Sequence, residues 1–84
     1  MENEAKEVKK VTIVHRGMVT GCKYLRLRKQ ASLESEVLEV LKEGSEVVVN
    51  KRASTKEFYK VSFGNLVGYC LRTFITITGV EQLE

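Results

Sequence analysis

The 84-residue sequence predicts a small, strand-rich barrel assembled around one hairpin. Its composition is rich in Val, Ile, Thr, Phe and Tyr, which favour strands, and it contains no Pro. Phe58–Phe63 and Leu66–Leu71 are two apolar stretches separated by Gly64 and Asn65. This arrangement predicts a two-residue type II′ hairpin turn, because Gly supplies the positive φ that the first turn position requires. Gly68, inside the second stretch, predicts a bulge or the close approach of another backbone.

The N-terminal third of the chain predicts a tail followed by short strands. Residues 1–10 are charged and offer little to bury, which is typical of a flexible tail. Val11–His15 alternates as a first strand that Arg16-Gly17 ends, and Met18–Thr20 is a short extended piece. In Tyr24–Arg28 the alternation is strict, with two leucines on one face and the tyrosine and both arginines on the other. This stretch predicts a strand with one buried face and one solvent-exposed face.

Residues 32–44 fit two different structures. Their apolar residues recur at helical spacing between a serine and a glycine that serve as caps, which slightly favours a helix of about three turns. The same residues fit a loop through Ser35 and a strand over Glu36–Leu41, followed by a turn into a further strand over Ser45–Asn50. Local pattern alone leaves both structures open.

The C-terminal third continues in short elements. Residues 51–57 form a polar loop before the hairpin, and Leu71–Thr73 has the length of one helical turn. Phe74–Thr78 is a last β-branched strand. Residues 79–84 are predicted to be a C-terminal tail.

Six short motifs follow one another between residues 25 and 75. They are Leu25–Arg28, the serine-containing loop 32–36, Val37–Val49, Phe58–Val61, Gly68–Cys70 and Phe74-Ile75. In this order they resemble the bacterial Src-homology-3 (SH3b) family over residues 11–78. That family shows a Leu-Asn-Val-Arg strand, a Val-aliphatic-x-x-Leu-x-x-Gly-x-x-Val-x-Val hairpin, a Trp-Tyr-Lys-Val strand and a Gly-Tyr-Val strand. Here Arg26 stands in place of the family's Asn, and Phe58 in place of its strand Trp.

The resemblance implies a fold and a class of function. It resolves residues 32–44 as loop and strand, because one hairpin register accounts for all the apolar residues of that segment. The implied fold class is all-β, a small SH3-like, partly open β-barrel of five to seven short strands with a single helical turn before the last strand. The implied function is that of a non-catalytic binding module. The stretches at residues 19–22 and 68–75 are similar to a narrower group, the short stand-alone SH3b proteins of anaerobic Gram-positive bacteria and their prophages.

Thiol chemistry would have to come from His15 with Cys22 or Cys70. Cys70 falls in a strand, at the family's apolar Val position, which predicts a buried, reduced thiol. Cys22 lies in a turn and is expected to be the more reactive of the two. The cysteines have no metal-ligand spacing and are too few for a disulfide scaffold. We therefore expect no enzyme activity, no cofactor and no metal site.

Net charge and hydropathy limit the classes of binding partner that we expect. A net charge of +3 is too small to favour nucleic acid. No apolar run reaches transmembrane length, and the first residues have no apolar signal core, so we expect no membrane partner and a cytoplasmic location by default. Release by lysis, or as part of a particle, is the alternative location.

The candidate binding site is a shallow groove of aromatic and basic side chains, as in barrels of this type. Its members are Tyr24, Arg26, Arg28, Phe58, Tyr69, Arg72 and Phe74. The competing interpretation places Phe58 and Phe74 in the core and the arginines on solvated strand faces. Two partners remain open: peptidoglycan peptides or another cell-wall ligand, and a protein partner of a phage- or prophage-encoded structural or adaptor protein.

Overall fold

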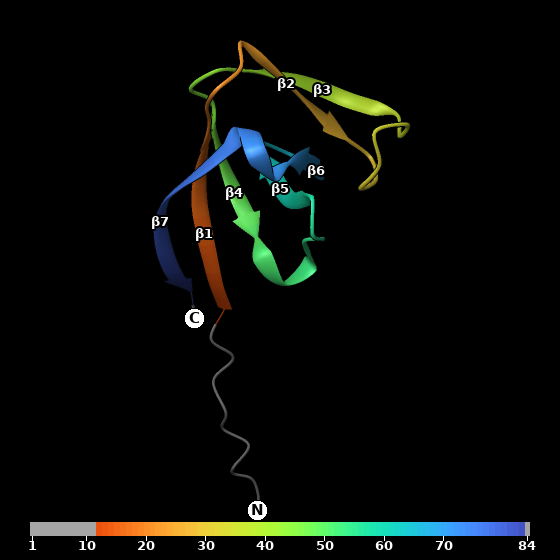
Figure 1. Ribbon diagram of the computed structural model, residues 1–84. Coiled ribbons are helices and arrows are strands. Elements are labelled where there is room, and N and C mark those ends of the chain that lie inside the picture. The colour runs from red at the N-terminus through yellow and green to blue at the C-terminus, as the bar shows by residue number, and fades with distance from the viewer. Residues whose placement is uncertain (1–11, 84) are drawn as a thin grey trace, which may run out of the picture.

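The computed structural model describes residues 12–83 and consists of seven β-strands and two single-turn 3₁₀ helices (Figure 1). The prediction for residues 1–10 lies outside the described residues. In chain order the elements are β1 Thr12–Val19, β2 Tyr24–Arg28, β3 Val37–Lys42, β4 Glu46–Asn50, η2 Lys51–Ala53, β5 Phe58–Phe63, β6 Leu66–Leu71, η3 Arg72–Phe74 and β7 Ile75–Leu83. The all-β prediction is confirmed, and η3 is the predicted helical turn before the last strand.

All seven strands belong to one antiparallel sheet with the order β3-β2-β6-β5-β4-β1-β7. The sheet curls, so that the β2–β3 pair lies across one end of the molecule while β1 and β7 run together toward the other end (Figure 1). Backbone hydrogen bonds link the end of β1 to the β3–β4 turn, from Val19 N to Ser45 O (2.9 Å) and from Gly44 N to Val19 O (2.8 Å). Within residues 12–83, β3 and β7 are the two edges of this partly open barrel.

The β5–β6 hairpin has the predicted register. Phe63 pairs with Leu66 across Gly64 and Asn65, and Gly64 has a φ of 60°. No described non-glycine residue has a positive φ, so Asn65 occupies the second position of a type II′ turn. Of the two predictions for Gly68, the close approach of another backbone is confirmed and the bulge is not. Its pairing with β5 is regular, and a Cβ at this position would collide with the carbonyl oxygen of Arg28 on β2.

Residues 32–44 form a loop and a strand, as the resemblance implied, and not a helix. β3 pairs with β2, and Leu41 turns into the core with 1% of its surface exposed. A shift in register lies between Leu27 and Arg28, where Leu27 pairs with Glu39 but Arg28 pairs with Val37. The extra residue on β3 is a bulge, which twists the strand and resets which side chains face outward.

The first strand differs from its prediction. We predicted a break at Arg16-Gly17, but β1 continues through these residues to Val19 and pairs with both β4 and β7. Gly17 is buried in the sheet, where a Cβ would lie 2.9 Å from Ile75 Cγ2 and 3.2 Å from Val49 Cγ2. The glycine therefore does not end the strand but lets two neighbouring side chains pack over it.

The last strand also differs, because the predicted C-terminal tail over residues 79–84 is wrong for residues 79–83. β7 runs to Leu83 and pairs with β1 along its whole length. Gly79 pairs with Arg16 beside a bulge at Thr78, whose hydroxyl donates to the Arg16 carbonyl oxygen (3.4 Å). The Arg16 guanidinium also forms an ion pair with Glu81 (3.2 Å). These contacts extend the strand past a glycine that in sequence looked like its end.

The curled sheet encloses one hydrophobic core. Its members come from every strand and are Val19, Leu25, Leu27, Leu41, Val47, Val49, Tyr59, Val61, Cys70 and Ile75. The β2 pattern is the one predicted, with both leucines buried and Tyr24 and Arg26 exposed. The face of β2 that bears Tyr24, Arg26 and Arg28 is therefore presented outward, where the candidate site lies.

Candidate functional site

Four of the seven predicted site residues surround one small groove. We call it the β2 groove, and it is lined by Cys22, Tyr24, Leu25, Arg26, Arg28, Leu71 and Phe74, with a volume of about 160 Å³. β2 contributes its outward side chains, while the end of β6 and η3 contribute Leu71 and Phe74. The Phe74 carbonyl accepts a hydrogen bond from Thr20 N (2.9 Å), which fixes η3 against the end of β1.

The aromatic members of the groove differ in exposure. Tyr24 is 63% exposed, so most of its ring is available for contact with a ligand. Phe74 is half-buried and packs against the core, so it forms the base of the groove and also belongs to the hydrophobic interior. The two competing interpretations of Phe74, groove and core, both describe part of its surroundings.

Phe58 and Tyr69 are not part of the β2 groove. Phe58 is 4% exposed, which agrees with the competing interpretation that it belongs to the interior. The loop before β5 folds back on it: Thr55 N donates to the Phe58 carbonyl (2.8 Å), and Phe58 N donates to Thr55 Oγ1 (3.1 Å). Tyr69 is half-buried and lines a different depression.

Two of the three predicted arginines fasten loops. Arg28 Nη1 donates to the carbonyl oxygens of Leu33 (2.8 Å) and Ser35 (3.1 Å), and so holds the loop between β2 and β3. A guanidinium can serve two carbonyls at once because its donors are fixed in a planar fork. Among the described residues, Arg26 has no hydrogen-bonding partner for its guanidinium, and its charge is directed to solvent at the groove.

Arg72 has the same fastening role on the loop between η2 and β5. Its Nη1 donates to the carbonyl oxygens of Thr55 (3.1 Å) and Lys56 (3.3 Å). Its guanidinium carbon lies 4.5 Å from the centre of the Tyr59 ring, within range of a cation–π interaction. Arg72 therefore belongs to the architecture around β5 and not to the β2 groove.

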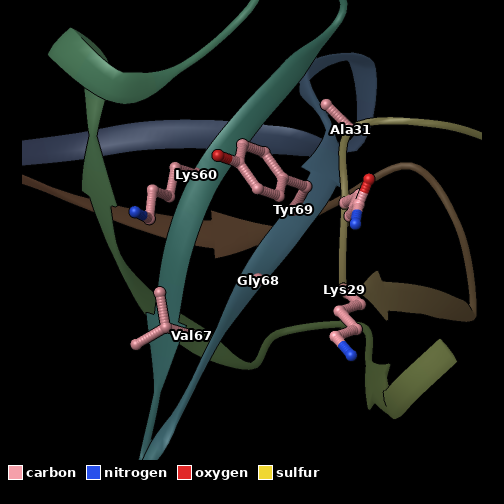
Figure 2. A pocket seen from close by; sticks show the side chains of 7 residues that line it. Lys29, Ala31, Lys60, Val67, Gly68 and Tyr69 are labelled. Atoms are coloured by element: carbon pink, nitrogen blue, oxygen red, sulfur yellow. The ribbon is translucent and has the colours of Figure 1, made fainter. Parts of the chain in front are cut away.

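The larger depression, which the sequence analysis did not find, surrounds Tyr69. We call it the Tyr69 hollow, and it is lined by Lys29, Gln30, Ala31, Lys60, Val67, Gly68 and Tyr69, with a volume of about 450 Å³ (Figure 2). Lys60 on β5 pairs directly with Tyr69 on β6. That pairing follows from the Gly64-Asn65 turn and could have been predicted. The arrival of Lys29–Ala31 beside β6 depends on the β2–β6 pairing, which no local motif indicates.

The two thiols are not activated. Cys70 is fully buried, as predicted, and Cys22 is half-buried; both are free thiols. Burial, followed by the neighbouring Cys22, raises the pKa of the Cys70 thiol from 9.0 to about 12, although Arg28 acts in the opposite direction. Partial burial, followed by the Glu43 carboxylate, raises the pKa of the Cys22 thiol. A nucleophilic cysteine requires a lowered pKa, so both thiols are in the wrong environment for that role.

The other polar groups of residues 12–83 do not gather into a chemical centre. No cluster of three or more His, Cys, Asp or Glu side chains in this range could hold a metal ion. The Nδ1 atom of His15 is buried and has no hydrogen-bonding partner among the described residues.

No helix in the described part of the chain is long and apolar enough to cross a membrane.

Comparison with known proteins identifies the class. The sequence model of the bacterial SH3 domain matches residues 23–76, which is more than half of the chain. This protein therefore belongs to the bacterial SH3 domain family, and the resemblance seen in the sequence is confirmed. Members of the family are in general binding modules for peptidoglycan or proteins. A search of curated proteins found no match.

Proposed function

We propose that this bacterial SH3 domain is a non-catalytic module that binds a peptide segment of the cell wall through the β2 groove. The observation that supports this function is the convergence of Tyr24, Arg26 and Phe74, from β2 and η3, around one groove. Phe74 is far from Tyr24 and Arg26 in the sequence. The fold brings together an exposed ring, a cation that has no partner among the described residues, and a hydrophobic base. A peptide that combines apolar side chains with carboxylates, as peptidoglycan stem peptides do, complements this combination.

Tyr24, Arg26 and Phe74 each have a defined part in this binding. The Tyr24 ring supplies rigid contact area at little entropic cost, as tyrosine does at many binding surfaces. Arg26 supplies charge that attracts a carboxylate, and this mainly accelerates association and adds salt sensitivity. Phe74 provides the apolar base on which a ligand side chain packs. The groove volume of about 160 Å³ suits one ligand side chain or a short length of backbone, not a large cofactor.

The thiol environment supports the non-catalytic part of the proposal. Cys22 lines the groove, but the pKa of its thiol is raised, so it is protonated at neutral pH. Cys70 lies behind it in the core. In this proposal the two cysteines are packing residues, and the groove holds its ligand without chemical change.

The test is co-sedimentation with purified peptidoglycan sacculi. Wild-type protein is expected in the pellet, and Tyr24→Ala should weaken binding by about 1–3 kcal/mol, as the loss of an aromatic anchor does. Val48→Ala is the matched control, because Val48 is 39% exposed on the sheet surface and lines neither depression. Wild-type protein that stays in the supernatant, or a Tyr24→Ala variant that is folded and sediments like wild type, contradicts the proposal.

A second candidate function is an adaptor, phage- or prophage-encoded, that binds another protein. Apolar side chains exposed around the edge strand β3 favour it: Leu33 is 63%, Val37 38% and Val40 46% exposed. In this role the protein would act inside the cell, in a particle, or after lysis. Failure to bind sacculi, together with stable capture of one protein from the encoding gene neighbourhood, would replace the first proposal with this one.

A further inference from the structure

We infer that the Tyr69 hollow is a second binding site, which receives a carboxylate-bearing side chain of an acidic peptide segment. The hollow is separate from the β2 groove, shares no lining residue with it, and is tested independently of it.

Three segments of the chain meet at the hollow. Lys60 comes from the middle of β5, Tyr69 stands opposite it on β6, and Lys29–Ala31 come from the loop that follows β2. Figure 2 shows Lys60 and Lys29 on opposite sides of the β5–β6 pair, with Gly68 between them and the Tyr69 hydroxyl directed toward the Lys60 side. Gly68 lies at the base, where only a glycine allows β2 and β6 to approach. A ligand group placed over Gly68, beside the Tyr69 ring, therefore has a lysine on each side.

The charged residues that line the hollow are all positive. Its lining includes two amines, an amide and a phenol, and no carboxylate. The two lysines are not equivalent, because Lys29 also borders a neighbouring depression that contains Glu34 and Glu36. These carboxylates offset part of the Lys29 charge, so the Lys60 side should attract an anion more strongly.

The apolar part of the lining favours a carboxylate on a short aliphatic stem. Val67, which is 52% exposed, lines the hollow together with Ala31 and Tyr69. The methylene groups of a glutamate side chain can contact these walls while its carboxylate meets an amine. No arginine lines the hollow, and a planar guanidinium fork is the group best suited to hold a phosphate. Two amines are also too few for a nucleic-acid backbone, which needs a longer basic track.

Arg28 positions the loop that forms one side of the Tyr69 hollow. Its two hydrogen bonds to the Leu33 and Ser35 carbonyls hold the loop that carries Lys29, Gln30 and Ala31. A further bond from Gln30 N to Ser35 Oγ (2.8 Å) closes the same loop. Arg28 is therefore a positioning residue for the hollow, since it acts on the ligand through the loop.

The experiment is a titration of ¹⁵N-labelled protein, observed by NMR, with two matched blocked peptides. One is acetyl-Ala-Glu-Ala-Glu-Ala-Gly-amide, and the other has Gln in place of both Glu residues. The Glu peptide should shift the amide signals of residues 29–31, 60 and 67–69, and the Gln peptide should bind at least about fivefold more weakly. Raising the ionic strength from 50 to 300 mM should weaken the binding of the Glu peptide, because the attraction is between exposed charges.

Variants separate the site from general electrostatics. Lys60→Gln should weaken binding of the Glu peptide about fivefold and Lys29→Gln somewhat less, while Lys56→Gln, an exposed lysine outside the hollow, should bind like wild type. The same spectra report whether each variant is folded. Equal weakening by all three variants, or shifts centred on Tyr24 and Phe74, overturns the assignment. Binding of inorganic tripolyphosphate at the hollow without binding of the Glu peptide also overturns it, and would identify a phosphate site instead.

Discussion

The β2 groove and the Tyr69 hollow lie on either side of one strand pairing but are built in different ways. The groove takes four of its lining residues from a single strand, and three of these four are outward side chains that alternate with the buried leucines. The hollow takes its side chains from two paired strands and a loop, and no one segment contains its pattern. The two sites meet where Arg28 pairs with Tyr69. A site along one strand is therefore visible in a sequence, whereas a site across strands becomes visible only with the topology.

Disrupting the β2–β6 junction, where Gly68 lies against β2, should have the largest effect on stability. Gly68→Val would place a branched side chain against the Arg28 carbonyl and the Leu27 side chain, so β2 and β6 could not pair as they do. We expect a loss of about 3 kcal/mol in the free energy of unfolding, as in overpacked interiors, measured by urea denaturation. Gly79→Ala is the control, because nothing lies within 4 Å of its added Cβ and its φ is not positive. A Gly68→Val protein as stable as wild type would show that the two sites do not depend on a tight junction.

The second-largest effect on stability is expected at alkaline pH. It arises from the Cys70 thiol, which lies on β6 between the two sites. Cys70 is flanked by Tyr69 of the hollow and Leu71 of the groove, and its pKa is raised from 9.0 to about 12 by burial. The unfolded chain ionises this thiol above pH 9 while the folded chain keeps it protonated, so its contribution to stability is complete below pH 9 and is lost as the pH approaches 12. The loss is about 1.4 kcal/mol per pH unit, or about 2 kcal/mol between pH 9 and 10.5.

Cys70→Val removes this thiol at a position where the family has valine, and isolates its contribution. Urea unfolding of both proteins at pH 8, 9 and 10.5 should show the wild type losing stability relative to the variant by about 2 kcal/mol over the last interval. The two proteins differ only at this side chain, so the difference between their stability curves reports on the thiol. Parallel stability curves for the two proteins would contradict the buried thiol. Maleimide labelling gives a second measurement, since Cys22 should react faster than Cys70 in the native protein.

The arginines should have the smallest effect, and they distinguish the loop-fastening role from the ligand-facing one. Arg28→Ala loses two hydrogen bonds to carbonyls at a half-buried position, and we expect a loss of about 1 kcal/mol in the free energy of unfolding. Hydrogen exchange should accelerate in residues 29–36. Arg26→Ala, the matched control on the same strand face, should change stability by less than about 0.5 kcal/mol. Equal effects of the two substitutions would erase the distinction between them.

Much of the fold followed from local sequence. The Gly64-Asn65 turn fixed the β5–β6 register, and the alternation in residues 24–28 fixed which face of β2 is buried. Residues 32–44 did not follow, since helix and strand patterns coincide there and only pairing with β2 separates them. Gly17 and Gly79 were interpreted as breaks because a glycine that ends a strand and one inside a strand look alike in a sequence. In the structure side chains pack over Gly17, and Gly79 continues β7 beside the bulge at Thr78.

The candidate site was predicted in part. Tyr24, Arg26 and Phe74 do line one groove. Strand alternation indicated that Tyr24 and Arg26 face outward, whereas Phe74 was assigned from the likeness to barrels of this type. The roles of Arg28 and Arg72 were not visible, since their partners are backbone carbonyls of loops whose path depends on the whole fold. Phe58 was assigned to the groove as a substitute for the family's tryptophan, but the loop through Thr55 folds back beside it.

The pairing of Thr12 with Leu83 brings the two ends of the described chain side by side, at the end of the β1–β7 ribbon away from β2 and β3 (Figure 1). Cα atoms paired in this way lie only about 5 Å apart, so a few Gly and Ser residues could join them into a closed loop. A circular permutant reopened at the exposed Gly64-Asn65 turn should keep the sheet order unchanged. For the same reason the domain can be tethered by either end, or inserted into a loop of a carrier protein, with the surface of β2 facing away from the attachment.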